Sequence, residues 1–343
     1  MDRSQMPPGP VLTQMLLGNR VQQAIYVAAK LGIADLLVDG PMGAEALAQA
    51  TGAHPGGLYR LLRALVGFGV FAEDAEGRFE LTPLAVLLQK GPRSKRAFAL
   101  WSGGVSYRLF GDLEYSVMTG EPAFDHLFGM EFFDYLAHNP EVGTLFDEFM
   151  SRQTAPVGPV VAAYDFAGAE IVVDVAGGRG ELIAAILSTH PDMRGVLLDE
   201  PRVIEGARRV LAAAGVADRC ETVCGDISES VPTGGDVYIL KSVVHGMDDN
   251  EAARVLRNCR QAMNEGAKLL LVELVMPTGN DPHPARLMDL LMLAGTHGGH
   301  ERTEEEFRSL FADAGLRMTN LMTTKYAYSV IEARAADNPS PGQ

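Results

Sequence analysis

The stretch Ile171-Val-Val-Asp-Val-Ala-Gly-Gly-Arg-Gly180 decides how the chain folds. Its apolar, β-branched beginning predicts a buried parallel strand. A helix is expected directly afterwards, from Glu181 to Leu187. The glycines between strand and helix allow the backbone to turn sharply and to approach a ligand closely. A ligand at this turn meets the free N–H groups of a helix N-terminus, so the stretch predicts a nucleotide-type cofactor site.

Glycine-rich turns of this kind bind two classes of cofactor, dinucleotides and S-adenosylmethionine (SAM). The dinucleotide fingerprint is Gly-x-Gly-x-x-Gly. Counted from Gly178 and Gly180, its third glycine falls on Ile183; counted from Ala176, the first glycine is missing and the third falls on Glu181. What remains is Asp-x-Ala-Gly-Gly-x-Gly, which resembles the first motif of methyltransferases that use SAM. There the loop passes close to the amino-acid portion of the cofactor.

Composition limits the partners. With 343 residues, 47% hydrophobic and 21% charged, the chain is typical of a soluble globular protein with room for two domains. A net charge of −15 argues against nucleic acid as a partner. The first ten residues lack the apolar core of a signal peptide, and no apolar run is long enough for a membrane span. We therefore expect no membrane partner. The few cysteines (Cys220, Cys224 and Cys259) indicate reduced thiols, which are typical of a cytoplasmic protein.

The first hundred residues predict a mainly helical module. Apolar residues recur at helical spacing in Val11–Leu37, Ala44–Ala50 and Pro55–Phe68, and Val70–Leu81 predicts a hairpin that turns at Asp74–Gly77. Helices followed by a hairpin form the winged-helix pattern, for which DNA binding is one use. Because acidic residues crowd the expected wing, we favour a dimerisation module over a DNA-binding regulator.

We expect three parts along the chain. Residues 1–100 form the winged-helix-like dimerisation domain, 101–160 form a helical linker that contributes to a substrate pocket, and 161–343 form a Rossmann-like cofactor domain. The linker region is rich in aromatic side chains, which could supply walls for a flat aromatic substrate. Met288 and Met292, on a helix expected over Arg286–Leu293, are further candidates for lining that pocket.

From Ile171 onward strands and helices alternate, which predicts an α/β fold with a mostly parallel, seven-stranded sheet and helices on both faces. Further strands are expected over Gly195–Asp199, Glu221–Asp226, Asp236–Lys241, Ala267–Val275, Arg317–Thr324 and Tyr326–Ala333. In such sheets the ligand lies across the C-terminal strand ends, where four polar residues fall: Asp174, Asp199, Asp226 and Lys241. Asp199 suits a ribose diol; its alternative role is a helix N-cap near Pro201.

Taken together, these motifs resemble the SAM-dependent O-methyltransferases of small molecules. That family includes plant caffeate and flavonoid enzymes and bacterial enzymes that tailor polyketides in secondary metabolism. The resemblance covers nearly the whole chain and rests on four motifs in order: Asp174–Gly180, Gly225–Ile227, Leu240–His245 and Gly298–Glu304. It implies methyl transfer to a hydroxyl of a small aromatic or polyketide-type molecule. It also implies SAM as cofactor, no metal, and a homodimer in which the N-terminal module reaches the partner's pocket.

The resemblance also implies residue roles. His245 matches the general base, and Glu273 and Glu301 match the two acids that flank it. The remaining positions match cofactor contacts: Gly177 at the amino-acid end, Asp199 at the ribose hydroxyls, Asp226 and Ile227 at the adenine, and Lys241 beside the cofactor.

The expected chemistry fits these residue types. A phenol with a pKa near ~10 facing an imidazole near ~6.5 leaves a gap of about 3.5 units, or roughly 5 kcal/mol. A carboxylate beside the imidazole narrows this gap because it favours the imidazolium and fixes the tautomer. Positioning of the acceptor in a water-poor site supplies much of the remainder.

Two positions depart from the family pattern. The family usually continues its base as His-Asp-Trp, whereas here the sequence is His245-Gly246-Met247, and the first glycine of the cofactor loop is Ala176. Some family members bind SAM but catalyse hydroxylation, decarboxylation or pericyclic steps, so such a reaction, or N-methylation, is the alternative. The retained His245, Glu273 and Glu301 favour O-methylation.

Overall fold

The computed structural model describes residues 7–91, 94–153 and 157–336. Its contacts divide the chain into two units. The first consists of the residues up to Gly111 together with Glu141–Arg152, and the second of Asp112–Pro140 together with the residues from Gln153 onward. The expected boundaries near residues 100 and 160 stay a prediction. No helix among the described residues is long and apolar enough to cross a membrane.

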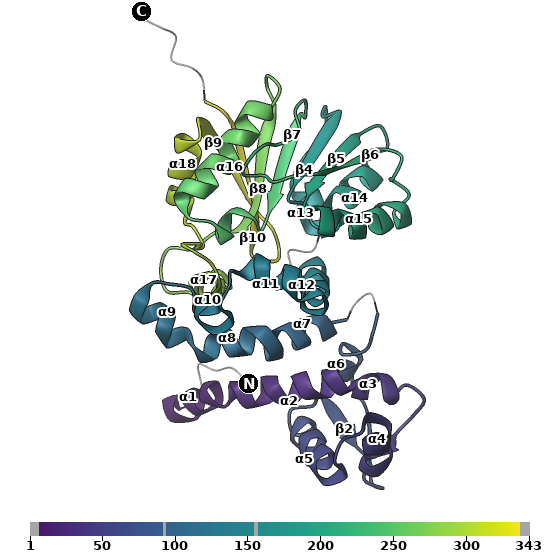
Figure 1. Cartoon of the computed structure of the whole chain (residues 1–343). Coiled ribbons are helices and arrows are strands. Elements are labelled where there is room, and N and C mark those ends of the chain that lie inside the picture. The colour runs from purple at the N-terminus through teal and green to yellow at the C-terminus, as the bar shows by residue number, and fades with distance from the viewer. Residues whose placement is uncertain (1–6, 92–93, 154–156, 337–343) are drawn as a thin grey trace, which may run out of the picture. The chain divides into compact units, whose positions relative to one another are not determined.

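The first unit is mainly helical, with one small sheet (Figure 1). Its helices are α1 (Pro8–Leu16), α2 (Gly18–Leu31), α3 (Ile33–Leu36), α4 (Ala44–Thr51), α5 (Pro55–Val66), α6 (Pro83–Val86), α7 (Arg96–Trp101), the π-helix η2 (Ser102–Ser106), α8 (Tyr107–Gly111) and most of α12 (Pro140–Gln153). The sheet has the antiparallel order β1 (Met42–Gly43), β3 (Arg78–Leu81), β2 (Phe71–Glu73). Helices α4 and α5 followed by the hairpin β2–β3 confirm the winged-helix-like arrangement.

The second unit contains a seven-stranded sheet in the order β6-β5-β4-β7-β8-β10-β9. Its strands are β4 (Ile171–Val175), β5 (Arg194–Asp199), β6 (Cys220–Cys224), β7 (Val237–Lys241), β8 (Lys268–Leu274), β9 (Leu316–Thr323) and β10 (Tyr328–Ala335). All neighbours pair in parallel except β10, which is antiparallel to β8 and β9. The predicted mostly parallel, seven-stranded sheet is confirmed.

Helices cover both faces of this sheet (Figure 1). One face carries α13 (Val157–Ala163), α14 (Glu181–Thr189) and α15 (Pro201–Ala213), and the other carries α16 (Asp249–Ala262) and α18 (Glu304–Asp313). The unit also contains α9 (Leu113–Thr119), α10 (Ala123–Phe128), α11 (Phe132–His138), the short 3-10 helix η3 (Val244–Gly246) and α17 (Ala285–Gly295). Each face buries its own apolar cluster, so the sheet is a rigid base for side chains at its edge.

The strand order reverses at β4, which pairs with β5 on one side and with β7 on the other. Asp174 is opposite Leu197 of β5 and Ile239 of β7. The C-terminal ends of these strands therefore lie at one edge, and such a reversal opens a crevice there.

Tyr238 connects β7 to the loop before it and to the end of α16. Its ring is fully buried. Its hydroxyl accepts from the Gly235 amide at 3.1 Å and lies 2.8 Å from the carbonyl oxygens of Pro232 and Ala262, to which it can donate in turn. One side-chain atom thus ties the loop before β7 to the end of α16.

Tyr238→Phe should destabilise the fold by about 1–3 kcal/mol, because it leaves buried backbone groups without their partner while keeping the ring. Chemical denaturation followed by fluorescence or circular dichroism measures this difference. Tyr326→Phe is the matched control, since that ring is 56% exposed, and it should leave the free energy of unfolding unchanged. Equal stabilities of the two variants would contradict this role of the Tyr238 hydroxyl.

Candidate active site

Asp174 lies at the crevice where the strand order reverses. It is 1% exposed, and neither carboxyl oxygen has a hydrogen-bond partner of good geometry among the described residues. Burial raises the pKa of Asp174 to about 7, although the charge of Lys241 at the end of β7 opposes this shift. Burial also lowers the pKa of Lys241, against the charges of Asp174, Glu181 and Glu273. The crevice therefore holds two incompletely solvated ionisable groups of opposite sign.

Gly177 lies directly against this carboxyl group. A Cβ at position 177 would come within 2.4 Å of Cγ of Asp174 and of Cδ1 of Leu197, so only glycine fits. Ala176 has a φ of +53°, in the left-handed region, where a residue with a Cβ costs roughly 1–2 kcal/mol. The loop therefore keeps its turn although alanine replaces the family's glycine at position 176, and the backbone of Ala176 is strained.

Asp199, at the end of β5, is bound to the same loop. Its Oδ2 accepts from the Gly178 amide and its Oδ1 from the Glu200 amide, both at 2.7 Å. Burial raises the pKa of Asp199 to about 6, even though these two hydrogen bonds favour the carboxylate. The N-cap of α15 is Glu200, which makes no side-chain cap, so the alternative role of Asp199 as that N-cap is wrong.

Asp226 and Ile227 follow β6 at the same edge of the sheet. The Asp226 side chain is exposed, and its Oδ1 accepts from the Ser228 amide at 2.7 Å. Ile227 is partly buried against the apolar cluster of α16 and α18. Asn258 of α16 donates to the Ile227 carbonyl at 3.0 Å, which fixes this turn.

His245 lies on η3, just beyond β7, with a side chain that is only 12% exposed. Its Nδ1 is 2.8 Å from Oε1 of Glu301 and 4.0 Å from Oε2 of Glu273. Both carboxylates are fully buried. Oε1 of Glu273 accepts from the amides of Val243 and Val244, at 3.0 and 3.1 Å. The structure thus brings the three predicted residues together, with Glu301 on the imidazole and Glu273 on the backbone that precedes it.

The electrostatics of this group favour a charged imidazole. Burial lowers the pKa of His245, but the charge of Glu273 and the contact with Glu301 outweigh it, so the net pKa is raised. Burial raises the pKa of Glu273 to about 7. An Nδ1–H that donates to Glu301 leaves the Nε2 lone pair available, so the arrangement can act as a general base whose conjugate acid is stabilised.

The same three residues offer ligand atoms that lie within 4.8 Å of one another, a spacing that could also hold a metal ion. However, His245 Nδ1 already faces a carboxylate, and one oxygen of Glu273 already accepts two N–H groups. These contacts match a base with its orienting acids more closely than an open coordination sphere.

The residues around the crevice suit SAM. The buried carboxyl group of Asp174, which has no well-aligned hydrogen-bond partner within the described part of the chain, can accept a cationic or hydrogen-bond-donating group. Carboxylates at two neighbouring strand ends, Asp199 and Asp226, can accept from hydroxyl or amino groups. This distribution fits a ligand with an ammonium group, a ribose diol and an adenine, and it offers no excess of cations for a pyrophosphate.

Three residues near the base do not follow from the sequence. Arg302 contacts the backbone on both sides of His245. Asp289 of α17 accepts from the Glu301 amide at 2.9 Å. Ser242 has a φ of +55°. Arg302 is part of the Gly298–Glu304 motif, but an arginine next to a capping box resembles a surface residue, so only its burial identifies it.

Comparison with known proteins gives concordant matches. Residues 110–317 match the model of the O-methyltransferase domain, and residues 13–91 match that of the O-methyltransferase dimerisation domain. Phenazine O-methyltransferase PhzM of Lysobacter antibioticus is 45% identical over 331 residues, which are 96% of this chain and 97% of that protein. Mitomycin biosynthesis 6-O-methyltransferase of Streptomyces lavendulae is 40% identical over 318 residues, 90% of this chain and 88% of that protein.

A solved structure of a similar protein contains ligands. NcsB1, an O-methyltransferase from neocarzinostatin biosynthesis in complex with SAM and 2-hydroxy-5-methyl naphthoic acid, superposes with a TM-score of 0.81 at 34% identity. The match covers 92% of this chain and 95% of that one.

Asp174→Asn should change how the stability of the cofactor-free protein depends on pH. An unfolded aspartate loses its proton near ~3.9, whereas the folded protein keeps this proton up to about pH 7. Between these values the folded state binds the extra proton, so this residue's contribution to the free energy of unfolding falls as the pH rises. From pH 5 to pH 8, the stability of the variant relative to wild type should improve by on the order of 2 kcal/mol.

Denaturant unfolding at several pH values measures this difference. The exposed Asp226→Asn is the matched control, and its stability should follow that of the wild type at every pH. Parallel curves for Asp174→Asn and wild type would contradict a protonated, buried Asp174.

Proposed function

This chain belongs to the SAM-dependent O-methyltransferase family, and we propose that it methylates a hydroxyl group of a small aromatic natural product with His245 as the general base. The observation that carries the proposal is the buried 2.8 Å contact between His245 Nδ1 and Glu301. An aromatic acceptor is supported by similar proteins named for phenazine and mitomycin, and by the naphthoic acid in the NcsB1 complex.

We propose that the cofactor is held at the C-terminal strand ends by Gly177, Asp199, Asp226, Ile227 and Lys241. When bound, SAM supplies a methyl group on a positively charged sulfur, which is already an electrophile. Asp199 accepts hydrogen bonds from the ribose hydroxyls, and the turn at Asp226 and Ile227 receives the adenine. This assignment is supported by the position of all five residues at one edge of the sheet.

His245 removes the proton of the acceptor hydroxyl in this scheme. Nε2 accepts the proton, and the imidazolium that forms is stabilised by Glu301 on Nδ1 and by the charge of Glu273 at 4.0 Å. Because both carboxylates raise the pKa of His245, they reduce the gap between the imidazole and a phenol. Glu273 also accepts hydrogen bonds from the amides of Val243 and Val244, so it orients the base in addition to stabilising its protonated form.

We further propose that the reaction needs no metal ion. His245 Nδ1 and Oε1 of Glu301 are already engaged with each other, and Oε1 of Glu273 already accepts from two backbone amides. Activity that survives extensive dialysis against a chelator supports this, and activity restored only by added divalent cations argues against it.

His245→Gln should lower methyl transfer by 10²–10⁴-fold, because general-base catalysis contributes about that much. The measurement is mass spectrometry of products from methyl-labelled SAM and a panel of phenols, hydroxylated phenazines and hydroxynaphthoates. In the wild type the rate should rise with pH through the raised pKa of His245, since only the neutral imidazole accepts a proton. His138→Gln, on the exposed end of α11, is the matched control and should retain full activity.

Several outcomes separate the alternatives. Label that appears only on aromatic amines, and that is unaffected by His245→Gln, would favour N-methylation, because a neutral amine needs no base before it reacts. SAM that binds but transfers no label to any acceptor, while the acceptor changes in mass, would favour a non-methylating reaction. SAM binding by the His245→Gln protein, measured by calorimetry, shows whether lost activity reflects lost cofactor.

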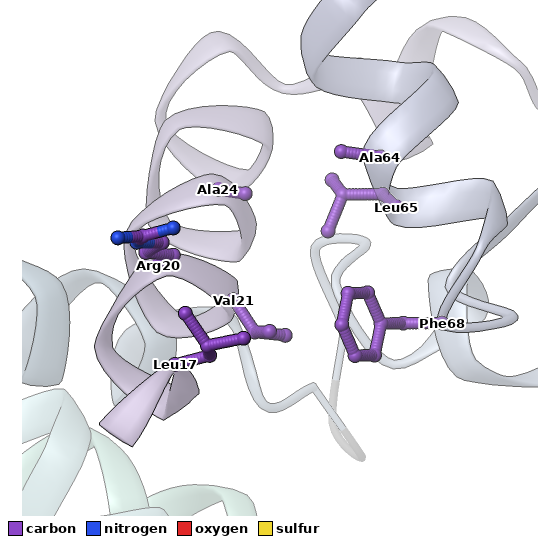
Figure 2. A pocket seen from close by; sticks show the side chains of 7 residues that line it. All are labelled: Leu17, Arg20, Val21, Ala24, Ala64, Leu65 and Phe68. Atoms are coloured by element: carbon purple, nitrogen blue, oxygen red, sulfur yellow. The ribbon is translucent and has the colours of Figure 1, made fainter. Parts of the chain in front are cut away.

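We propose that a second copy of this chain covers an apolar surface of the first unit. Helix α1 has no buried residue, and Leu12, Met15 and Leu16 on it are more than half exposed. Beside it, α2 and α5 flank an apolar groove, shown in Figure 2, that is lined by Leu17, Arg20, Val21, Ala24, Ala64, Leu65 and Phe68. Exposed apolar surface of this kind marks an interface. A homodimer is supported because the matched dimerisation domain, residues 13–91, includes this whole groove.

Phe68→Lys should weaken this dimer, because it places a charge where an apolar side chain would be buried. Sedimentation velocity should show the wild type at twice the 36.8 kDa chain mass and the variant with an increased monomer fraction. Val38→Lys also replaces an exposed apolar residue of the first unit but does not line the groove, so it should remain dimeric. A variant at Phe68 that is as dimeric as wild type at micromolar concentration would contradict the proposed interface.

A further inference from the structure

Arg302 is a buried arginine beside the base that the proposed reaction does not use. It lies between α17 and α18, next to the N-cap residue Thr303, and it is 1% exposed. A buried guanidinium destabilises the fold unless its donors are bonded. The contacts that compensate this burial are therefore informative about its role.

The donors of Arg302 bracket the base. Nη1 donates to the carbonyl oxygen of Val244 at 2.7 Å, and Nη2 donates to that of Met247 at 2.9 Å. Nε and Nη2 also donate to Oδ1 of Asp249, at 3.0 and 2.8 Å. The two carbonyl groups stand on either side of His245 and Gly246. Because the guanidinium is planar and its donors are fixed relative to one another, it sets the distance between those carbonyls.

The segment that carries Arg302 is itself anchored. The Arg302 carbonyl accepts from the Met276 amide at 2.9 Å, just beyond β8. A Cβ on Gly299 would lie 2.7 Å from the His245 carbonyl oxygen and 2.8 Å from the Gly246 carbon, so the two segments touch backbone to backbone. Arg302 thus connects the end of β8 to the loop that carries His245.

Glu273 binds the amides of Val243 and Val244 at the start of this loop, whereas Arg302 binds the carbonyl groups of Val244 and Met247. Gly246 contributes no side chain, and Ser242 before the loop adopts a left-handed φ of +55°, a conformation that persists only where its surroundings enforce it. From this geometry we propose that Arg302 is a positioning residue, which holds the loop of residues 244–247 so that His245 Nδ1 meets Glu301. This inference rests on the proposed role of His245 as the base.

A positioning role and a purely electrostatic role of Arg302 have different effects on the pKa of His245. The charged groups that face His245 among the described residues are Glu273 from β8 and Glu301 and Arg302 from the segment before α18. The positive charge of Arg302 opposes protonation of His245, so its removal alone would raise the pKa of His245. If Arg302 maintains the contact with Glu301, its removal weakens that contact and lowers the pKa instead. The two roles therefore predict opposite shifts.

The experiment compares Arg302→Lys, which keeps the charge but loses the planar fork, with Arg302→Met, which loses both. We expect both variants to bind SAM within about 3-fold of wild type and to lower kcat by roughly 10–100-fold, as for a base that is misplaced by about 1 Å. We expect the acid limb of the kcat–pH profile to move to lower pH in both. An unchanged kcat in both variants, or an acid limb that moves to higher pH in Arg302→Met with kcat retained, would overturn the proposal.

Arg219→Lys is the matched control. Arg219 also donates to three backbone carbonyls, those of Leu187, His190 and Met193, but at the end of α14. The variant should lose stability while keeping the kcat and pH profile of the folded enzyme. If it loses kcat as Arg302→Lys does, the effect of Arg302 is general destabilisation and the proposal is wrong.

Combination with His245→Gln distinguishes this inference from the proposed function. If Arg302 acts through His245, Arg302→Lys should cost no further activity in the His245→Gln protein. Full additivity of the two changes would reject a role through His245. An active His245→Gln protein would instead show that the proposed base is wrong, whereas an inactive one beside fully active Arg302 variants would reject only the positioning role.

Discussion

Strand β4 pairs in parallel with both β5 and β7, and this pairing places the C-terminal ends of three strands at one edge of the sheet. The helices that follow these strands leave toward opposite faces, so a crevice opens between them. Asp174 and Lys241 come from the two strands that border the crevice. Asp174 and Lys241, which are 67 positions apart in the sequence, thereby come together in one site, and the site depends on the sheet being fully paired.

The buried carboxylates of the second unit show two different uses of charge. Glu332 of β10 is bonded by Tyr164, Thr319 and Arg334, and these hydrogen bonds lower its pKa despite burial. Asp174 and Glu273 instead have pKa values raised to about 7 by burial, and each keeps at least one oxygen without a partner among the described residues. A satisfied carboxylate stabilises the fold. An unsatisfied one lowers stability, and it is found where a ligand or a reacting group is expected.

The departures from the family pattern are accommodated by the surroundings of each loop. Ala176 keeps a left-handed turn because Gly177 after it lies against Asp174 and the sheet holds both. Gly246 and Met247 replace bulkier residues, yet both carbonyls that flank the pair His245–Gly246 are bound by a buried arginine. Backbone contacts thus preserve a loop whose side chains differ.

The sequence by itself determined the strands, their order along the chain and the identity of the residues at their ends, because alternation and turn chemistry are local properties. The Asp174–Gly180 turn and the hairpin at Val70–Leu81 were predictable for that reason. Only the tertiary structure decided which oxygen of which acid meets His245, why position 177 must be glycine, and that Arg302 is buried. The contacts of His245 and Arg302 join segments more than fifty residues apart, and Gly177 lies against Leu197 of the neighbouring strand β5. The distances and burial of such contacts leave no periodic trace in the sequence.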